Sequence, residues 1–211
     1  MKATGSNDFE LKDAFIPSHR AADFLRYASR DNDGVALYPS CELLQYPMYR
    51  ILAIIHGAVA VGTAEAALEL FPEAVAKRVR PGSGPILAEA ETHAAYGEAT
   101  QAAHIARLML DDAVQRTERL YGRGSADPSH EELALLNLSV TGSATEAFHA
   151  VDVIVQAAGA SIQRDGTPLD LICRNTQVMR NHITLDRRRT QRLAGRIRLG
   201  LGLDVPHDAQ Y

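Results

Sequence analysis

The chain has 211 residues, of which 46% are hydrophobic, and a formal net charge of −4. This length and composition suit one globular domain, or one domain with a small appendage, and the charge argues against a nucleic-acid binder, which needs a basic surface. We expect neither a secretory leader nor a membrane span, because the start MKATGSND is polar and the most apolar run, residues 51–64, is too short to cross a bilayer.

The two cysteines, Cys41 and Cys173, lie far apart and form no zinc-type or redox-type spacing. Isolated thiols of this kind are typical of proteins from a reducing compartment. We therefore expect free cysteines and a cytoplasmic location.

The first predicted element is a strand at residues 9–16, with the sequence FELKDAFI. Its apolar side chains Phe9, Leu11 and Phe15 follow a loose period of two, and Pro17 closes the run. A lone strand is not stable, and no later segment has the pattern of a partner strand.

The rest of the chain predicts helices. The expected ranges, in chain order, are residues 47–71, 84–121, 129–158 and 167–194. Ser129 and Glu132 form a capping-box pattern, and Thr167 followed by Pro168 is a cap and a first-turn proline. No Gly or Pro interrupts the last range before Gly195, so the pattern alone predicts one helix through His182. The predicted fold class is all-α, an up-and-down four-helix-type bundle with a short N-terminal strand.

One pattern invites a metal-site interpretation. A di-iron bundle needs two Glu-x-x-His pairs on separate helices, together with further glutamates. Only Glu146 and His149 form such a pair in this sequence. We therefore expect no metal, and interpret His149 as a hydrogen-bonded histidine.

His182 lies in the stretch RNTQVMRNHITLDRRRTQR, between arginines. No acid or nucleophile nearby suggests a hydrolytic triad, so the residue is either a packed imidazole or a general base or hydrogen-bond donor in a pocket. Arg188, Arg192 and Arg196 recur at a spacing of four residues. This stripe either binds an anion or is solvated and pairs with carboxylates at a subunit interface.

Two segments resemble a known family. The run GSNDFELKDAFIPSHR is similar to the last strand of the β domain in the acyl-CoA dehydrogenase superfamily, where a D-x-F-V-P-x-H-R exit leads into a C-terminal helical domain. The run AFHAVDVIVQAAGASIQRDGTPLDLICRNTQVMRNH resembles a later part of that domain, with an A-V-D … A-A-G-A helix, an arginine, and a histidine eight residues after it. The resemblance implies a helix junction at about Asn181 and His182.

The details resemble the two-component flavin-dependent monooxygenase branch of this superfamily. His182 stands where the dehydrogenases commonly have a glutamate base, and no glutamate occurs between Asp170 and Asp204. The resemblance implies that His182 is catalytic, assisting deprotonation of a phenol or stabilising a flavin hydroperoxide. It also makes Arg174 and Asn175 the candidate cofactor-binding residues, although Asn175 replaces the usual aspartate.

The resemblance further implies how this chain is organised and what it binds. Residues 1–20 correspond to the terminal strand of a β domain and a linker, and residues 21–211 to the helical domain, about the C-terminal half of a family member. The expected cofactor is reduced FMN or FAD, shared with the missing domains or a partner. The expected partners are a small aromatic or similar substrate, a flavin reductase, and copies of the chain itself in a dimer or tetramer, but no nucleic acid and no membrane.

Two alternatives stay open at this point. An acyl-CoA dehydrogenase proper is disfavoured by the missing glutamate. A helical assembly module without catalysis would keep the bundle and bind no flavin.

Overall fold

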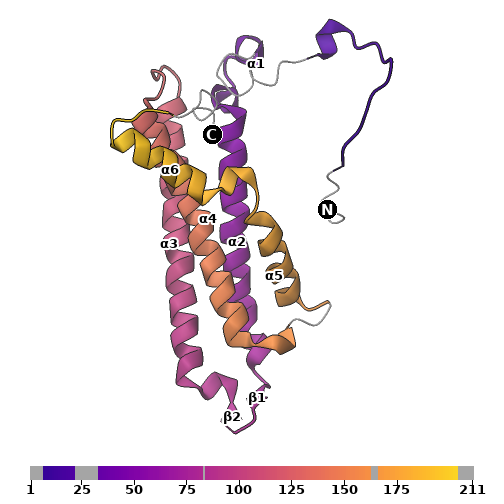
Figure 1. Ribbon diagram of the computed structural model, residues 1–211, viewed down its shortest axis with the longest axis vertical. Coiled ribbons are helices and arrows are strands. Elements are labelled where there is room, and N and C mark those ends of the chain that lie inside the picture. Colours follow the sequence, from indigo (N-terminus) through magenta and orange to yellow (C-terminus); the bar gives the residue numbers. More distant parts are fainter. Residues whose placement is uncertain (1–6, 22–32, 83, 163–165, 204–211) are drawn as a thin grey trace.

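The computed structural model describes residues 7–21, 33–82, 84–162 and 166–203 (Figure 1). Its helices and strands are, in chain order, α1 Asp33–Leu37, α2 Met48–Val75, β1 Val79–Arg80, β2 Gly84–Pro85, α3 Ala90–Tyr121, α4 His130–Ala158, α5 Pro168–Met179 and α6 Arg187–Arg198. Short 3-10 turns lie between them, including Ile183–Leu185 between α5 and α6.

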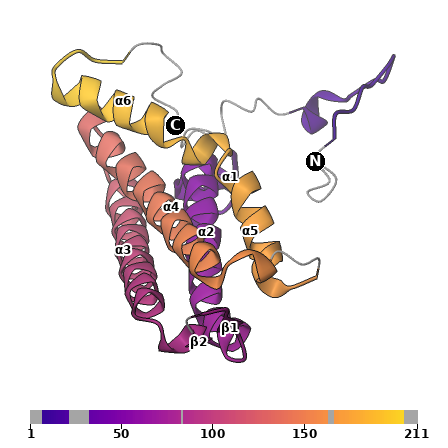
Figure 2. The same cartoon turned by 60° about the horizontal axis from the view of Figure 1, so that its bottom comes forward.

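Three long helices, α2, α3 and α4, run alternately up and down, with the shorter α5 beside α2 (Figure 1). Helix α6 crosses one end of the bundle and packs on α4 (Figure 2). This arrangement confirms the all-α, up-and-down bundle predicted from the sequence.

Helices α3 and α4 pack closely on each other, and both contribute small side chains to the interior of the bundle. Both helices bury rows of alanines, namely Ala99, Ala102, Ala103, Ala106 and Ala113 on α3 and Ala144, Ala147, Ala150 and Ala158 on α4. We call these residues the alanine seam. Helix α2 also packs closely, since a Cβ added at Gly57 would lie 3.2 Å from the Ser143 Oγ. Larger buried side chains such as Phe71, Leu136 and Ile154 fill the remaining core.

Helix α2 continues past the proline that was predicted to end it. Pro72 lies inside the helix, which runs to Val75. A proline has no N–H to donate to the carbonyl four residues earlier, here that of Leu68. The Tyr96 hydroxyl of α3 donates to that carbonyl at 3.3 Å, and its ring stacks on Phe71 at 5.6 Å between centroids. Tertiary contacts thus satisfy the group that the proline leaves unpaired.

Helix α2 is also long and apolar enough, by length and composition, to cross a membrane. This corrects the expectation that the apolar run is too short. In the structure α2 packs on α3, α4 and α5.

Helix α3 begins later than predicted, at Ala90. Gly84 and Pro85 instead form β2, which pairs antiparallel with β1 through Val79 to Pro85 and Arg80 to Gly84. The φ of Gly84 is +97°, outside the helical region, and this conformation suits a glycine in a tight hairpin.

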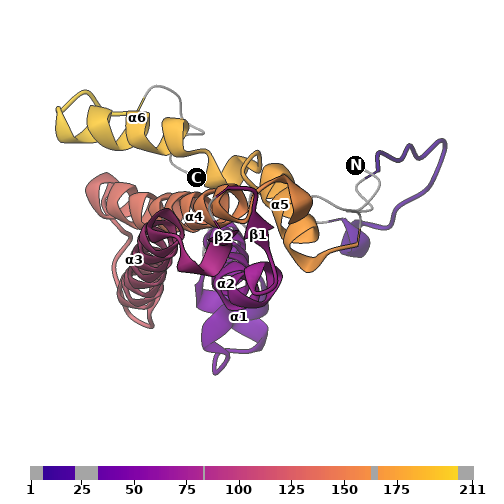
Figure 3. The same ribbon diagram turned by 90° about the horizontal axis from the view of Figure 1, so that it is seen from below.

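The predicted strand at residues 9–16 is not formed. Phe9 and Phe15 are 87% and 89% exposed, and this segment lies away from the bundle (Figure 3). A strand needs a neighbouring strand to accept its backbone hydrogen bonds, and the described part of the chain places none beside it. The predicted domain boundary after residue 20 borders residues 22–32, which lie outside the described residues.

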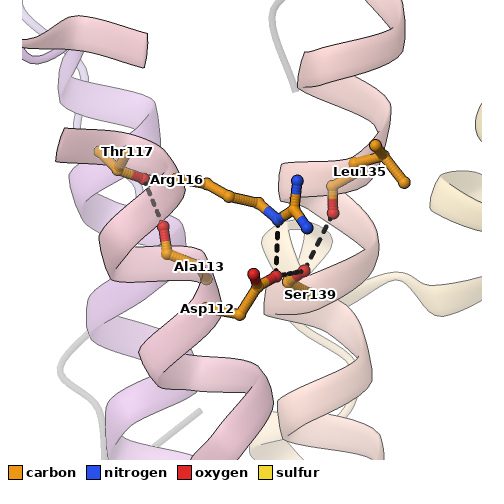
Figure 4. Close-up of polar contacts among 6 residues, drawn as sticks. All are labelled: Asp112, Ala113, Arg116, Thr117, Leu135 and Ser139. Carbon is orange, nitrogen blue, oxygen red and sulfur yellow. Dashed lines mark hydrogen bonds and ion pairs between the residues drawn. The ribbon is translucent and has the colours of Figure 1, made fainter. Parts of the chain in front are cut away.

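A polar cluster joins α3 to α4 near one end of the alanine seam (Figure 4). The Arg116 Nε–H and the Ser139 hydroxyl both donate to Asp112 Oδ2, each at 2.6 Å. Burial alone would raise the pKa of Asp112, but these two hydrogen bonds and the charge of Arg116 outweigh it and lower the pKa. The carboxylate is therefore ionised at neutral pH and holds the two helices together.

Candidate functional site

A groove of about 690 Å³ lies between α4 and the junction of α5 and α6. One wall is a face of α4, formed by Thr145, Phe148, His149 and Asp152, which recur at helical spacing. The other wall comes from most of residues 180–188, including His182. The groove therefore gathers the histidine singled out by the sequence with polar and charged side chains from a second helix.

Two side-chain caps break the last predicted helix into α5 and α6. The His182 Nδ1 accepts the backbone N–H of Thr184 and caps the turn Ile183–Leu185. Asp186 then accepts the backbone N–H of Arg189 and caps α6. The single helix predicted from the pattern is wrong, and the junction implied by the resemblance is confirmed. Side chains that bond nearby backbone groups compete with helix continuation, and neither Gly nor Pro is needed.

An ion pair fixes this junction to α4. The Arg180 Nη2 donates to both carboxylate oxygens of Asp152, at 2.9 and 3.1 Å. The guanidinium also lies over the Phe148 ring, 5.5 Å from its centroid. Asp152 belongs to the A-V-D motif, so the structure gives that motif a physical role, which is to position the residues just before His182.

His182 is part of a chain of hydrogen-bonding groups that sequence reasoning missed. Its Nδ1 lies 2.8 Å from the Thr184 Oγ1, which lies 3.0 Å from the Nδ1 of His56 on α2. The two imidazole rings are 3.9 Å apart between centroids and tilted by 36°. Thr184 is 128 residues from His56, and no sequence pattern links them. The only signal of this contact in the sequence was the position of His56 within an apolar helical segment.

The environment of His56 favours its neutral form. Burial lowers the pKa of His56 below 6.5, the positive charge of a protonated His182 lowers it further, and a hydrogen bond to the Leu52 carbonyl partly opposes both effects. Two stacked imidazolium rings would repel each other. The pair therefore accepts one proton more readily than two.

We expect this histidine to make stability depend on pH. Because the folded-state pKa of His56 is lowered, its contribution is fully present above pH 6.5 and is lost as pH falls through the folded-state pKa. The free energy of unfolding should fall less steeply with acidification in His56→Asn than in the wild type. Urea titrations of both proteins from pH 8 downwards measure this difference, and parallel pH profiles would contradict it.

Arg174 and Asn175, the predicted cofactor-binding residues, lie on the exposed surface of α5 and do not line the groove. Arg174 pairs with Asp170, one turn earlier on the same helix, at 2.9 Å. The family pattern has an aspartate directly after Arg174, where this chain has Asn175. Here the buried Asp170 is the carboxylate that pairs with Arg174. The structure thus keeps these two residues apart from His182, and their role in cofactor binding stays a prediction.

His149 makes a hydrogen bond of 2.9 Å with Glu98 of α3, and both side chains are about half exposed. Glu146, its predicted motif partner, plays no part in this contact. Among the described residues, no three His, Cys, Asp or Glu side chains are grouped to hold a metal ion.

The comparisons with known proteins agree on one family. Residues 54–187 match the family described as acyl-CoA dehydrogenase, C-terminal domain. The chain is 26% identical over 205 residues to the oxygenase component of p-hydroxyphenylacetate 3-hydroxylase from Acinetobacter baumannii, covering 97% of the chain and 48% of that protein. It is also 26% identical over 208 residues to the oxygenase subunit HsaA, a flavin-dependent monooxygenase of Rhodococcus jostii, covering 95% and 53%.

Solved structures show the same fold. XiaF from Streptomyces, in complex with FADH2 and glycerol, superposes with a TM-score of 0.79 at 21% identity, covering 93% of this chain and 49% of that one. The 3-HSA hydroxylase from Rhodococcus gives a TM-score of 0.79 at 21% identity, covering 95% and 50%. The chain thus spans about half the length of the relatives it matches.

Proposed function

Since this chain belongs to the family of acyl-CoA dehydrogenase C-terminal domains, we propose that it is the helical half of the oxygenase component of a two-component flavin-dependent monooxygenase. Its curated relatives are oxygenases of this kind, and it covers about half of each. The remaining half of the flavin and substrate pocket would come from further domains or from a partner polypeptide. The reaction proposed is hydroxylation of a small aromatic substrate.

The observation that carries this proposal is His182 at the α5–α6 junction, with one ring nitrogen free. Its Nδ1 is occupied by Thr184, whereas its Nε2 makes no hydrogen bond within the described residues. A histidine whose Nδ1 accepts a backbone N–H carries its proton, when neutral, on Nε2. His182 therefore offers a hydrogen-bond donor to an oxygen atom bound in the groove.

The donors of the groove fit one edge of a flavin ring or a phenolic substrate. Besides the Nε2 of His182, the Nε of Arg180 is buried and has no acceptor in the described part of the chain. A flavin ring and a phenolate both present acceptor atoms at their edges. When bound, reduced flavin supplies the electrons and the oxygen chemistry, while this chain orients the ligand and holds a proton at the His182 Nε2.

The carboxylates of the groove argue against an acyl-CoA dehydrogenase. That reaction needs a free carboxylate base, but Asp152 is paired with Arg180 and Asp186 caps α6. Neither is placed to abstract a proton from a ligand.

The other parts of the proposal follow from the relatives. The oxygenase would take its reduced flavin from a separate reductase, and we take FAD as the first flavin to test, with FMN for comparison, because XiaF holds FADH2.

We also propose a cytoplasmic homo-oligomer, a dimer or tetramer, that binds neither membranes nor nucleic acid. The exposed apolar residues Ile55 and Val59 of α2 support an assembly that covers this helix. Light scattering that shows a monomer would contradict the oligomer.

Flavin titrations test the function directly. Reduced and oxidised FAD and FMN are titrated against the 211-residue chain, alone and together with the polypeptide region that completes the oxygenase. We expect tight binding of reduced flavin only to the completed protein, and hydroxylation of phenols when a flavin reductase is added. Oxidation of an acyl-CoA with an artificial electron acceptor, or the absence of flavin binding in every combination, would overturn the proposal.

A further inference from the structure

Among the histidines that the structure describes, His56 is the one linked to His182, and it lies on α2. It is half-buried on α2, and its Nδ1 is 3.0 Å from the Thr184 hydroxyl, which in turn is 2.8 Å from the Nδ1 of His182. The flavin proposal gives this arrangement no role. The three groups form a hydrogen-bonded line from α2 to the groove.

The direction of this line follows from the Thr184 backbone. Its N–H points at the His182 Nδ1 at 3.3 Å, so that nitrogen acts as an acceptor. The Thr184 hydroxyl has a single proton and two histidine neighbours. With Nδ1 of His182 an acceptor, the hydroxyl donates to it, and its oxygen then accepts the Nδ1–H of His56. A neutral His56 has one N–H, which is therefore shared between the Thr184 oxygen and the Leu52 carbonyl.

We infer that His56 is a positioning residue, which orients the Thr184 hydroxyl proton toward His182 and thereby keeps the His182 proton on Nε2, where it faces a bound ligand. The N–H of His56 occupies one of the two acceptor lone pairs of the Thr184 oxygen and so fixes the rotation of the hydroxyl. Without it, the hydroxyl can turn away, and its oxygen can accept a hydrogen bond from an Nδ1–H of His182, which is the opposite tautomer. This inference rests on the proposed function only in treating the groove as the ligand site.

The groups around His182 support the assignment of its tautomer to His56 and Thr184. The two carboxylates that line the groove are engaged elsewhere, since Asp152 pairs with Arg180 and Asp186 caps α6. The proximity of the two rings, 3.9 Å between centroids, disfavours a charge on both. When both rings are neutral, this alignment of donors satisfies the contacts of Thr184 with each of them.

Nitrogen NMR of the histidine rings tests the inference on the complete chain without any flavin. At about pH 8, some 1.5 units above the ordinary histidine pKa, the ¹⁵N shifts report which ring nitrogen carries the proton. The His182 signals are assigned by their loss in His182→Asn. We expect a protonated Nε2 and an unprotonated Nδ1 in the wild type.

Two pairs of variants separate the hydrogen bond from packing. In His56→Leu and in Thr184→Val, the tautomer ratio of His182 should move by about five- to tenfold toward Nδ1–H, the effect of losing one hydrogen bond. His56→Asn, whose amide N–H replaces the Nδ1–H, and Thr184→Ser, which keeps the hydroxyl, should restore the wild-type ratio. Circular dichroism confirms that each variant is folded.

Two results would overturn the inference. One is a wild-type His182 that carries its proton on Nδ1. The other is an unchanged His182 spectrum in whichever of His56→Leu and Thr184→Val folds. Because no flavin is present, failure here is separate from failure of the flavin titrations.

Discussion

Replacement of His182 by asparagine is expected to lower the hydroxylation rate of the completed oxygenase by about 100-fold or more, the usual contribution of a positioned proton donor or acceptor. Asparagine is a good capping residue, so its side-chain oxygen can still accept the Thr184 N–H while the imidazole is lost. The measurement is product formed per reduced flavin consumed, with a flavin reductase and a phenolic substrate.

Two controls make this result interpretable. His104→Gln changes an exposed histidine of α3 that does not line the groove, and it should leave the rate unchanged. His182→Ala removes both the ring and the cap, so it should also lower the free energy of unfolding, by up to about 1 kcal/mol. A rate for His182→Asn within about twofold of the wild type would show that His182 only packs and caps the turn, and takes no part in the reaction.

The largest effect on stability is expected at Phe71. This side chain is 1% exposed and stacks on Tyr96, so Phe71→Ala should lower the free energy of unfolding by about 3–5 kcal/mol. The loss combines the transfer free energy of the ring with the cavity that it leaves. It would also loosen the contact through which the Tyr96 hydroxyl reaches the Leu68 carbonyl beside Pro72. Urea denaturation followed by circular dichroism measures the change.

The chain offers a matched control in Phe15, which is 89% exposed. Phe15→Ala makes the same chemical change outside the core, and its effect should stay within about 0.5 kcal/mol. Equal losses at the two positions would show that residues 9–16 are packed in solution, against the arrangement described above.

The sequence located the long helices because their apolar residues recur at helical spacing, and Ser129 with Glu132 placed the start of α4 correctly. It failed where a distant contact decides the outcome. Pro72 predicts a helix end, but α2 continues through it because Tyr96 of α3 supplies the missing hydrogen-bond donor. Gly84 and Pro85 predict a helix start, but in the structure they form a strand that pairs with β1.

In the candidate site, too, one part could be predicted and the contacts between distant residues could not. Resemblance placed His182 at a helix junction, and the structure shows the caps that create it. His56 and Thr184 could not be predicted together, because only the packing of α2 against the α5–α6 junction brings them within hydrogen-bond distance. The pairing of Asp152 with Arg180 was equally hidden, although both residues lie in the motif that carried the resemblance.

The alanine seam has a consequence for how this protein tolerates change. Ala144, Ala147 and Ala150 are buried inside the bundle, while Thr145, Phe148 and His149, on the same two turns of α4, line the groove. One added methylene on the seam side displaces α4 and therefore moves the groove wall opposite His182. Alanines in the middle of a long helix look permissive in sequence, yet in a mutational scan these positions should be among the least replaceable of the chain.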